Sequence, residues 1–281
     1  MNPAAVLLAI TLVAGSHHVA LIDGLRNEVR VIGGATFQTG ETPVDAAFVG
    51  NDVYVLERDA HTLSLAGTSK RVSVAQDPAF VRESNGKLYV YSRATGTVEE
   101  ITRDLRVARR LSIAPFASDF EIVGRNGYLA FPHEAKVRTF SIASMQAIGE
   151  IKVGAVPVDL ASAGGITLAI ADPSAKRVWL IEGEQTMAQA IARGFIRGLL
   201  GLGLSTNRHS EFPTGVDRVA TRGSLWIAYD SSSGTLYRFT KSKVTIVARN
   251  VAPGSWAVTD DGLAIWDGTA LRLHSVETAR P

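Results

Sequence analysis

A glycine followed by a short apolar run recurs along this chain at nearly constant spacing, and this repeat constrains the fold more than any other feature. Each run is rich in Tyr, Leu, Val and Ile, and the runs begin at Gly50, Gly86, Gly127, Gly165, Gly223 and Gly262. The spacings between successive glycines are 36, 41, 38, 58 and 39 residues. A period of about 40 residues indicates a repeat architecture in which each repeat is one small structural unit.

Each repeat contains the elements of a four-stranded sheet. A polar turn follows the apolar run, and an aspartate opens three of these turns, at Asp172, Asp230 and Asp267. An aspartate suits such a turn because its carboxylate accepts backbone N–H bonds. The strands that come next alternate polar and apolar residues, as in 235–240. Helical periodicity is almost absent, so the sequence predicts an all-β chain, a β-propeller of four-stranded blades.

The number of blades follows from counting repeats. A seventh repeat begins at Gly15, which lies 35 residues before Gly50. Seven blades are therefore favoured, with six as the alternative if residues 1–15 are removed. The predicted organisation is a single propeller domain over 16–281, with an apolar insertion near 185–212.

A second marker lies at the start of the expected innermost strand of a blade. It is a proline followed closely by an aspartate, as in Pro43-Val44-Asp45 and Pro157-Val158-Asp159. Four repeats carry an aspartate at this position, namely Asp45, Asp119, Asp159 and Asp217. Carboxylates gathered at one channel mouth could bind a ligand or a hard cation such as Ca²⁺. The alternative is that each aspartate caps its own turn. The basic residues near equivalent strands, which could neutralise the carboxylates, are Arg82, Arg125 and Arg218.

The order Gly-x-x-Pro-x-Asp, then Gly-x-x-Tyr-Val, then a turn opened by Asp resembles the YVTN-type, or surface-layer-like, β-propeller repeat. The resemblance covers nearly the whole chain. The tetrapeptide that names the family is absent, and its nearest approaches are Tyr54-Val55-Leu56-Glu57 and Tyr89-Val90-Tyr91-Ser92. The resemblance implies the propeller fold and says little about function, because propellers host binding proteins, lyases, lactonases and scaffolds.

The spacing of 58 residues marks the insertion. Glycines at 194, 198, 201 and 203 disfavour a regular helix or strand there. The apolar residues between them include Phe195, Ile196, Leu199 and Leu200. Exposed apolar surface is normally covered, so the segment 194–212 is predicted to project from its blade and to contact a partner, a ligand or a membrane. The alternative is a helix that caps the edge of a blade.

Residues 4–15 form an uncharged apolar run that is too short to cross a bilayer, which needs about 20 residues. The run fits the apolar part of a signal peptide that is cleaved after Gly15, and it also fits a buried first strand. The first interpretation predicts a secreted, periplasmic or membrane-anchored extracytoplasmic protein. Such a protein could associate with a membrane through its N-terminus as well as through the segment 194–212. The alternative location is the cytoplasm.

Composition and motifs narrow the function classes. The chain has no cysteine, which excludes a disulfide, a thiolate nucleophile and a Cys-based metal site. Its 29 basic and 27 acidic residues give a net charge of +2, so we expect no nucleic-acid partner. The sequence contains no nucleophile elbow, P-loop, Rossmann glycine motif or zinc-binding His-Glu-x-x-His. His61 and His133, with Asp59 and Glu134 close by, offer an alternative acid–base or metal site.

Two functions from different classes remain. We expect a non-enzymatic binding or scaffold protein, without a cofactor, that uses one propeller face and the insertion to hold a protein or a small-molecule ligand. The alternative is a metal-dependent propeller hydrolase or lyase, similar to lactonases, with its site at the four aspartates. The sequence offers no His or Asn cluster to match these aspartates, and we therefore favour the binding function.

Overall fold

The computed structural model describes residues 10–15, 18–152, 156–163, 167–182, 209–240 and 243–274. These residues form 27 β-strands and one short 3-10 helix, Pro132–Glu134. Within the described residues, no helix is long and apolar enough to cross a membrane. The chain has two compact units, the first made of 1–117 and 250–281 and the second of 118–249.

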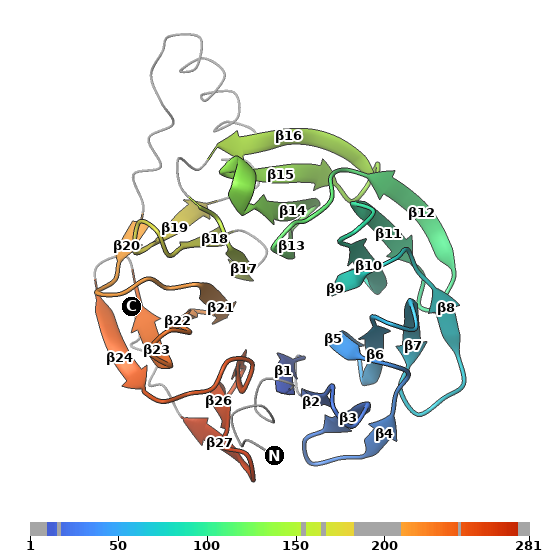
Figure 1. Ribbon diagram of the computed structural model, residues 1–281, viewed down its shortest axis with the longest axis horizontal. Coiled ribbons are helices and arrows are strands. Elements are labelled where there is room, and N and C mark those ends of the chain that lie inside the picture. The colour runs from blue at the N-terminus through green and yellow to red at the C-terminus, as the bar shows by residue number, and fades with distance from the viewer. Residues whose placement is uncertain are drawn as a thin grey trace. The chain divides into compact units, whose positions relative to one another are not determined.

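The first unit contains four antiparallel sheets, each built from consecutive strands (Figure 1). Its first sheet comprises β1 (Ile10–Ala14), β2 (Val19–Asp23), β3 (Glu28–Val31) and β4 (Thr36–Gln38). The second comprises β5 (Pro43–Val49), β6 (Asp52–Glu57), β7 (Thr62–Leu65) and β8 (Arg71–Ser73). The third comprises β9 (Pro78–Ser84), β10 (Lys87–Ser92), β11 (Thr97–Ile101) and β12 (Val107–Ser112). The last has three strands, β25 (Trp256–Thr259), β26 (Gly262–Trp266) and β27 (Leu271–His274).

The second unit contains three four-stranded antiparallel sheets. One comprises β13 (Asp119–Val123), β14 (Asn126–Phe131), β15 (Lys136–Ser141) and β16 (Gln146–Lys152). The next comprises β17 (Asp159–Ala163), β18 (Thr167–Asp172), β19 (Arg177–Glu182) and β20 (His209–Glu211). The third comprises β21 (Arg218–Arg222), β22 (Leu225–Asp230), β23 (Thr235–Phe239) and β24 (Val244–Ala248).

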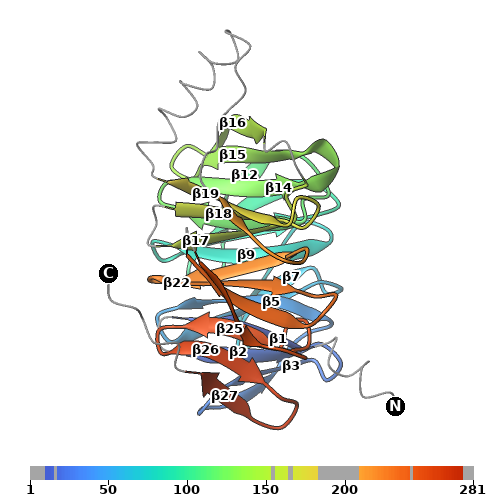
Figure 2. The same cartoon turned by 90° about the vertical axis from the view of Figure 1, so that its left-hand side faces the viewer.

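Within each unit, the first strands of successive sheets lie next to one another. In the first unit β25 neighbours β1, β1 neighbours β5, and β5 neighbours β9, and in the second unit β17 lies between β13 and β21. Figure 2 shows the sheet of β25 and β26 beside the sheet of β1 and β2. Small antiparallel sheets that repeat in this way define the β-propeller fold. The described residues form seven such sheets, so seven blades are confirmed and the six-blade alternative is wrong.

The apolar runs fold as strands buried on both faces. In β10, Leu88, Val90 and Tyr91 are 0% exposed and Tyr89 is 3% exposed. Alternate side chains of a strand point to opposite faces of its sheet, and neighbouring sheets cover both faces in the middle of each unit. One apolar cluster joins the second sheet to the third, through residues such as Leu56, Leu63 and Val81. This two-sided burial is why the sequence shows continuous apolar runs there instead of strict alternation.

The predicted aspartate turns are confirmed. The Asp172 carboxylate accepts the backbone N–H of Ala175 at 3.2 Å, and that of Asp230 accepts the N–H of Ser232 at 2.9 Å. Burial raises the pKa of Asp230, but hydrogen bonds from neighbouring hydroxyl groups outweigh it and hold that pKa below its usual value. Aspartates therefore close these turns, as the residue type requires.

The first and last sheets meet inside the first unit. The backbone N–H of Leu12 in β1 donates to the carbonyl of Gly254 at 2.8 Å. Ile10 and Leu12 are buried in a cluster with Ala257 of β25. The predicted first strand is thus present over Ile10–Ala14. Cleavage after Gly15, the signal-peptide interpretation, would remove a strand that the last sheet packs against.

The insertion is partly outside the described residues. Residues 183–208, which include Phe195, Ile196, Leu199 and Leu200, are not among them. The end of the predicted projecting segment, however, joins its sheet, because β20 pairs with β19 and Phe212 is only 5% exposed. The prediction that 194–212 projects as a whole is therefore wrong for 209–212, because His209–Glu211 pairs with β19 as the fourth strand of its sheet.

Two adjacent carboxylates are buried in the third sheet. Glu99 of β11 pairs with Arg110 at 2.8 Å, and Glu100 pairs with Lys87 at 2.9 Å and with Arg109. Burial raises the pKa of Glu100, but hydrogen bonds from Arg109 and Lys87 outweigh it and bring that pKa below its usual value. Glu100 therefore stabilises the fold in its ionised form.

We expect Glu100→Gln to flatten the acid side of the stability profile. A carboxyl group with a lowered pKa in the folded state contributes fully above its unfolded pKa, about 4.3, and loses that contribution as the pH falls through the folded value. Urea unfolding between about pH 7 and pH 3 measures the slope. The exposed Glu41→Gln serves as the control, and equal slopes for wild type and Glu100→Gln would contradict the assignment.

Candidate functional site

The four predicted aspartates lie where the sequence placed them, at the start of the first strand of a sheet. Asp45 lies in β5 in the first unit. In the second unit, Asp119 begins β13, Asp159 begins β17, and Asp217 directly precedes β21. The three aspartates of the second unit therefore share one position in the repeat, and Asp45 lies in the first strand of its sheet in the first unit.

Three of these carboxylates hydrogen-bond to the first strand of the next sheet. Asp45 Oδ2 accepts the backbone N–H of Val81 at 2.9 Å. Asp119 Oδ2 accepts the N–H of Leu160 at 2.8 Å, and Asp159 Oδ2 accepts that of Val219 at 2.6 Å. A buried N–H without an acceptor is costly, so each aspartate stabilises the junction between two sheets.

Asp217 follows the local pattern instead. Its carboxylate accepts the backbone N–H of Ser231 at 3.1 Å and the Ser231 hydroxyl, both from the turn after β22 of its own sheet. The turn-capping interpretation is thus correct for Asp217. The bonds between sheets were not predicted, because the donors lie 36 to 60 residues away and the sequence carries no sign of the pairing.

Asp45 also forms an ion pair. Arg82 Nη1 lies 2.8 Å from Asp45 Oδ2, which confirms that Arg82 neutralises this carboxylate. Burial raises the pKa of Asp45, and the Arg82 charge together with the backbone donors Val81 and Ala46 only partly offsets that effect. The Asp45 carboxylate is therefore occupied by protein donors.

The histidine–carboxylate alternative gains no support from local contacts. Asp59 accepts the Thr42 hydroxyl in the first unit, and Glu134 pairs with Arg138 at 2.7 Å in the second. His61 has a left-handed backbone with φ 50° in the turn between β6 and β7. Among the described residues, no group of three or more His, Asp or Glu side chains is arranged to hold a metal ion.

The third sheet departs from the aspartate pattern. Phe80 pairs with Tyr91 in the register where Asp45 pairs with Leu56, so an aromatic ring occupies the aspartate position. The guanidinium carbons of Arg82 and Arg93 lie 5.7 and 5.6 Å from the centroid of this ring. Guanidinium groups at this distance interact favourably with an aromatic face.

Phe116 is exposed and is joined through its backbone to Arg93. Its side chain is 65% exposed, and its backbone N–H donates to the carbonyl of Arg93 at 3.0 Å. Phe80, Arg82, Arg93 and Phe116 are referred to below as the Arg93–Phe116 surface. Sequence reasoning missed it, although Phe80 in Pro78-Ala79-Phe80, at the position of the recurring aspartate, was the signal that could have found it.

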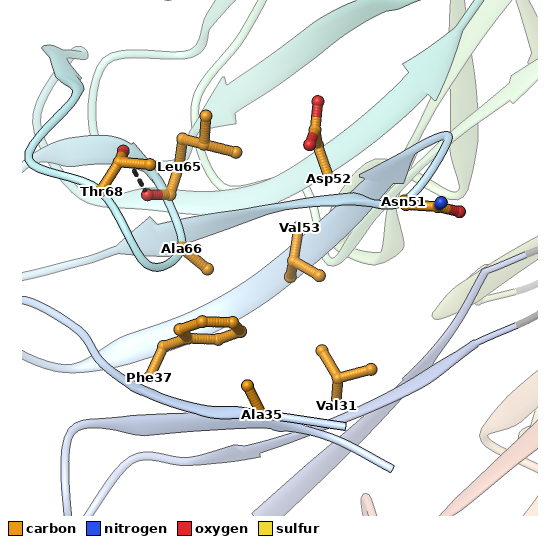
Figure 3. A pocket seen from close by; sticks show the side chains of 9 residues that line it. All are labelled: Val31, Ala35, Phe37, Asn51, Asp52, Val53, Leu65, Ala66 and Thr68. Atoms are coloured by element: carbon orange, nitrogen blue, oxygen red, sulfur yellow. Dashed lines mark hydrogen bonds between the residues drawn. The ribbon is translucent and has the colours of Figure 1, made fainter. Parts of the chain in front are cut away.

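A separate pocket of about 310 Å³ opens between the first and second sheets. Figure 3 shows Val31, Ala35 and Phe37 facing Val53 and Ala66 across it. The side chain of Asp52, which also lines the pocket, pairs with Arg103 at 2.6 Å. The polar lining residues Asn51, Asp52 and Thr68 all bond within the protein, so the pocket offers a ligand mainly apolar contact.

The seven small antiparallel sheets define this chain as a β-propeller protein. No protein-family model and no curated protein sequence matches the chain.

Several solved propeller structures are similar to this chain. A streptogramin B lyase structure aligns over 92% of this chain and 90% of its own, with a TM-score of 0.69 and 12% identity. Virginiamycin B lyase from Staphylococcus aureus aligns over 95% and 92%, with a TM-score of 0.67 and 11% identity. The WD40 domain of Neurospora crassa Pan2 aligns over 91% and 84%, with a TM-score of 0.64 and 12% identity. Enzymes and WD40 proteins both occur among these structures, so the similarity shows the fold alone.

Proposed function

We propose that this chain is a non-enzymatic β-propeller that binds or scaffolds a partner protein. The observation that carries the proposal is the Arg93–Phe116 surface, where the exposed Phe116 is hydrogen-bonded through its backbone to Arg93, which has no ion pair among the described residues. Exposed residues of these two types are typical of binding surfaces. The aspartates near this surface and in the second unit, in contrast, hold sheets together.

Three finer parts of the proposal rest on the sequence pattern. They are membership of the YVTN-type repeat family, an extracytoplasmic location, and a second contact through the insertion at Phe195, Ile196, Leu199 and Leu200. Each of the three is consistent with a protein that binds its partners outside the cytoplasm.

Selection of a random peptide display library on the immobilised full chain tests the binding function. We expect a family of related peptides to be enriched, and the best of them, made synthetically, to bind with saturable affinity in fluorescence anisotropy. Failure to enrich any related family would count against a protein-binding function.

The metal-dependent lyase or hydrolase remains the second candidate, because the fold is similar to that of streptogramin B lyases. Under the binding proposal, Ca²⁺ or a chelator should leave the melting temperature unchanged, since a bound cation would stabilise the native state. Asp159→Ala should cost about 1–3 kcal/mol by leaving the Val219 N–H unpaired, equally with and without Ca²⁺. The exposed Asp261→Ala is the control.

The opposite result is equally clear. A melting temperature that rises with Ca²⁺ in wild type and not in Asp159→Ala would establish a cation site. Turnover of quinupristin, which is bound in a solved structure of inactive virginiamycin B lyase, would then be measured by mass spectrometry.

A further inference from the structure

We propose that the Arg93–Phe116 surface binds an extended segment of a partner protein in which a carboxylate side chain lies next to an apolar one. This inference rests on the proposed binding function and assigns its site and the chemistry of its partner. Four observations carry it: the charge on Arg93, the exposure of Phe116, the strained backbone of Phe116 and the rigidity of the segment around it.

The first observation is the balance of charge. Arg82 is paired with Asp45 at 2.8 Å, and Arg58 lies 3.6 Å from Asp77. Arg93 is half-buried over Phe80 and has no carboxylate partner in the described part of the chain. A planar guanidinium favours bidentate pairing with a carboxylate. The surface therefore carries one uncompensated positive charge that an acidic side chain of a partner would pair with.

The second and third observations concern Phe116. This side chain is 65% exposed, and its backbone has φ 66°, in the left-handed region that bulky residues rarely adopt. Such a conformation costs about 1–3 kcal/mol and persists only where surrounding structure enforces it, often at functional sites. An exposed aromatic ring held on such a backbone is available for contact with an apolar side chain of a partner.

The fourth observation is that hydrogen bonds to the end of β10 hold this segment. The Tyr91 hydroxyl donates to the carbonyl of Ala114 at 2.8 Å and accepts the N–H of Ala117 at 3.0 Å. Phe116 N–H donates to the carbonyl of Arg93. The segment also lies against Gly96, where an added Cβ would be 2.2 Å from the Ala114 carbonyl carbon. One rigid backbone thus presents both anchor residues, which lowers the entropy cost of binding.

The same contacts argue for a peptide over other anions. Phe116 lies on an exposed loop, and the surface is outside the pocket between the first and second sheets, so a small carboxylic acid would find little enclosure. Nucleic acid binds through many phosphate contacts, whereas Asp45 and Asp77 neutralise the two neighbouring arginines. A peptide side-chain pair, one acidic and one apolar, matches one free guanidinium and one exposed ring.

The test measures the affinity of the best library-selected peptide for wild type and for variants of this surface. We expect the enriched peptides to carry Asp or Glu next to Phe, Leu or another apolar residue. Arg93→Gln and Phe116→Ala should each weaken binding by about tenfold or more, which equals about 1.4 kcal/mol. The matched controls are Arg71→Gln and Leu25→Ala, two exposed residues of the same unit, and both should bind within about twofold of wild type.

Phe116→Gly separates binding from folding. Glycine adopts a positive φ without strain, so this variant should melt at the same or a higher temperature than wild type while it loses affinity. If Phe116 instead serves the structure, Phe116→Gly lowers the melting temperature, and the inference is wrong. Selected peptides that bind equally to Arg93→Gln and Phe116→Ala would also overturn it while leaving the binding function standing. If the library yields no binder, the binding function fails, and the inference fails with it.

Discussion

Deletion of residues 1–15 is expected to remove the cooperative unfolding transition of the chain. The deletion takes away β1, and with it the buried side chains Ile10 and Leu12 and the hydrogen bond from Leu12 to Gly254. Burying each of these side chains contributes about 1.5–3 kcal/mol, and the native state of a domain is stable by only about 5–15 kcal/mol. Circular dichroism during heating and urea unfolding of 16–281 measure the effect.

A point substitution makes the same case without truncation. Leu12→Ala should cost about 2–5 kcal/mol, because it leaves a cavity in the cluster that joins the first and last sheets. Leu273→Ala, at a side chain that is 57% exposed, should change stability by less than about 0.5 kcal/mol. If 16–281 melts within a few degrees of the full chain, β1 is dispensable and the signal-peptide interpretation gains weight.

Gly254→Ala is expected to destabilise the first unit by at least about 2 kcal/mol. Gly254 has φ 76°, and an added Cβ would lie 2.3 Å from the carbonyl oxygen of Ile10. The methyl group therefore strains its own backbone and pushes β1 away from the loop that accepts the Leu12 hydrogen bond.

Gly33→Ala is a matched control for this substitution. Gly33 has the same φ of 76°, but an added Cβ would meet no atom within 4 Å. The two variants share the cost of the left-handed backbone, so the difference between their unfolding free energies isolates the contact with β1. Equal free energies would show that the closure between the first and last sheets contributes little.

The repeat pattern predicted the architecture because it follows from local chemistry. Turn glycines such as Gly50 and Gly86 have positive φ values and open space around them, so their role is readable from residue type. The aspartates that cap turns, such as Asp172, are likewise local. The strands that follow them were predicted from two-residue periodicity, and they pair in the expected order.

The candidate site depended on contacts that no local pattern reports. The partner of Asp159 is the N–H of Val219, 60 residues away, and the backbone N–H carries no side-chain signature. Phe116 becomes notable only through its exposure and its φ, which depend on how Tyr91 holds the segment. The end of the insertion was misjudged because His209–Glu211 is short and polar, and its pairing with β19 sets its place.

A hydrogen bond that joins the first strands of two sheets also couples their opening. In a linear array of modules, stability is the sum of what each module contributes and what each nearest-neighbour junction adds. The bonds of Asp119 and Asp159 make β13, β17 and β21 one such array within the second unit. Native-state hydrogen exchange should therefore show these strands protected as one cooperative group. Loss of either carboxylate would divide that group, and amides on one side of the weakened junction would exchange faster while those on the other side keep their protection.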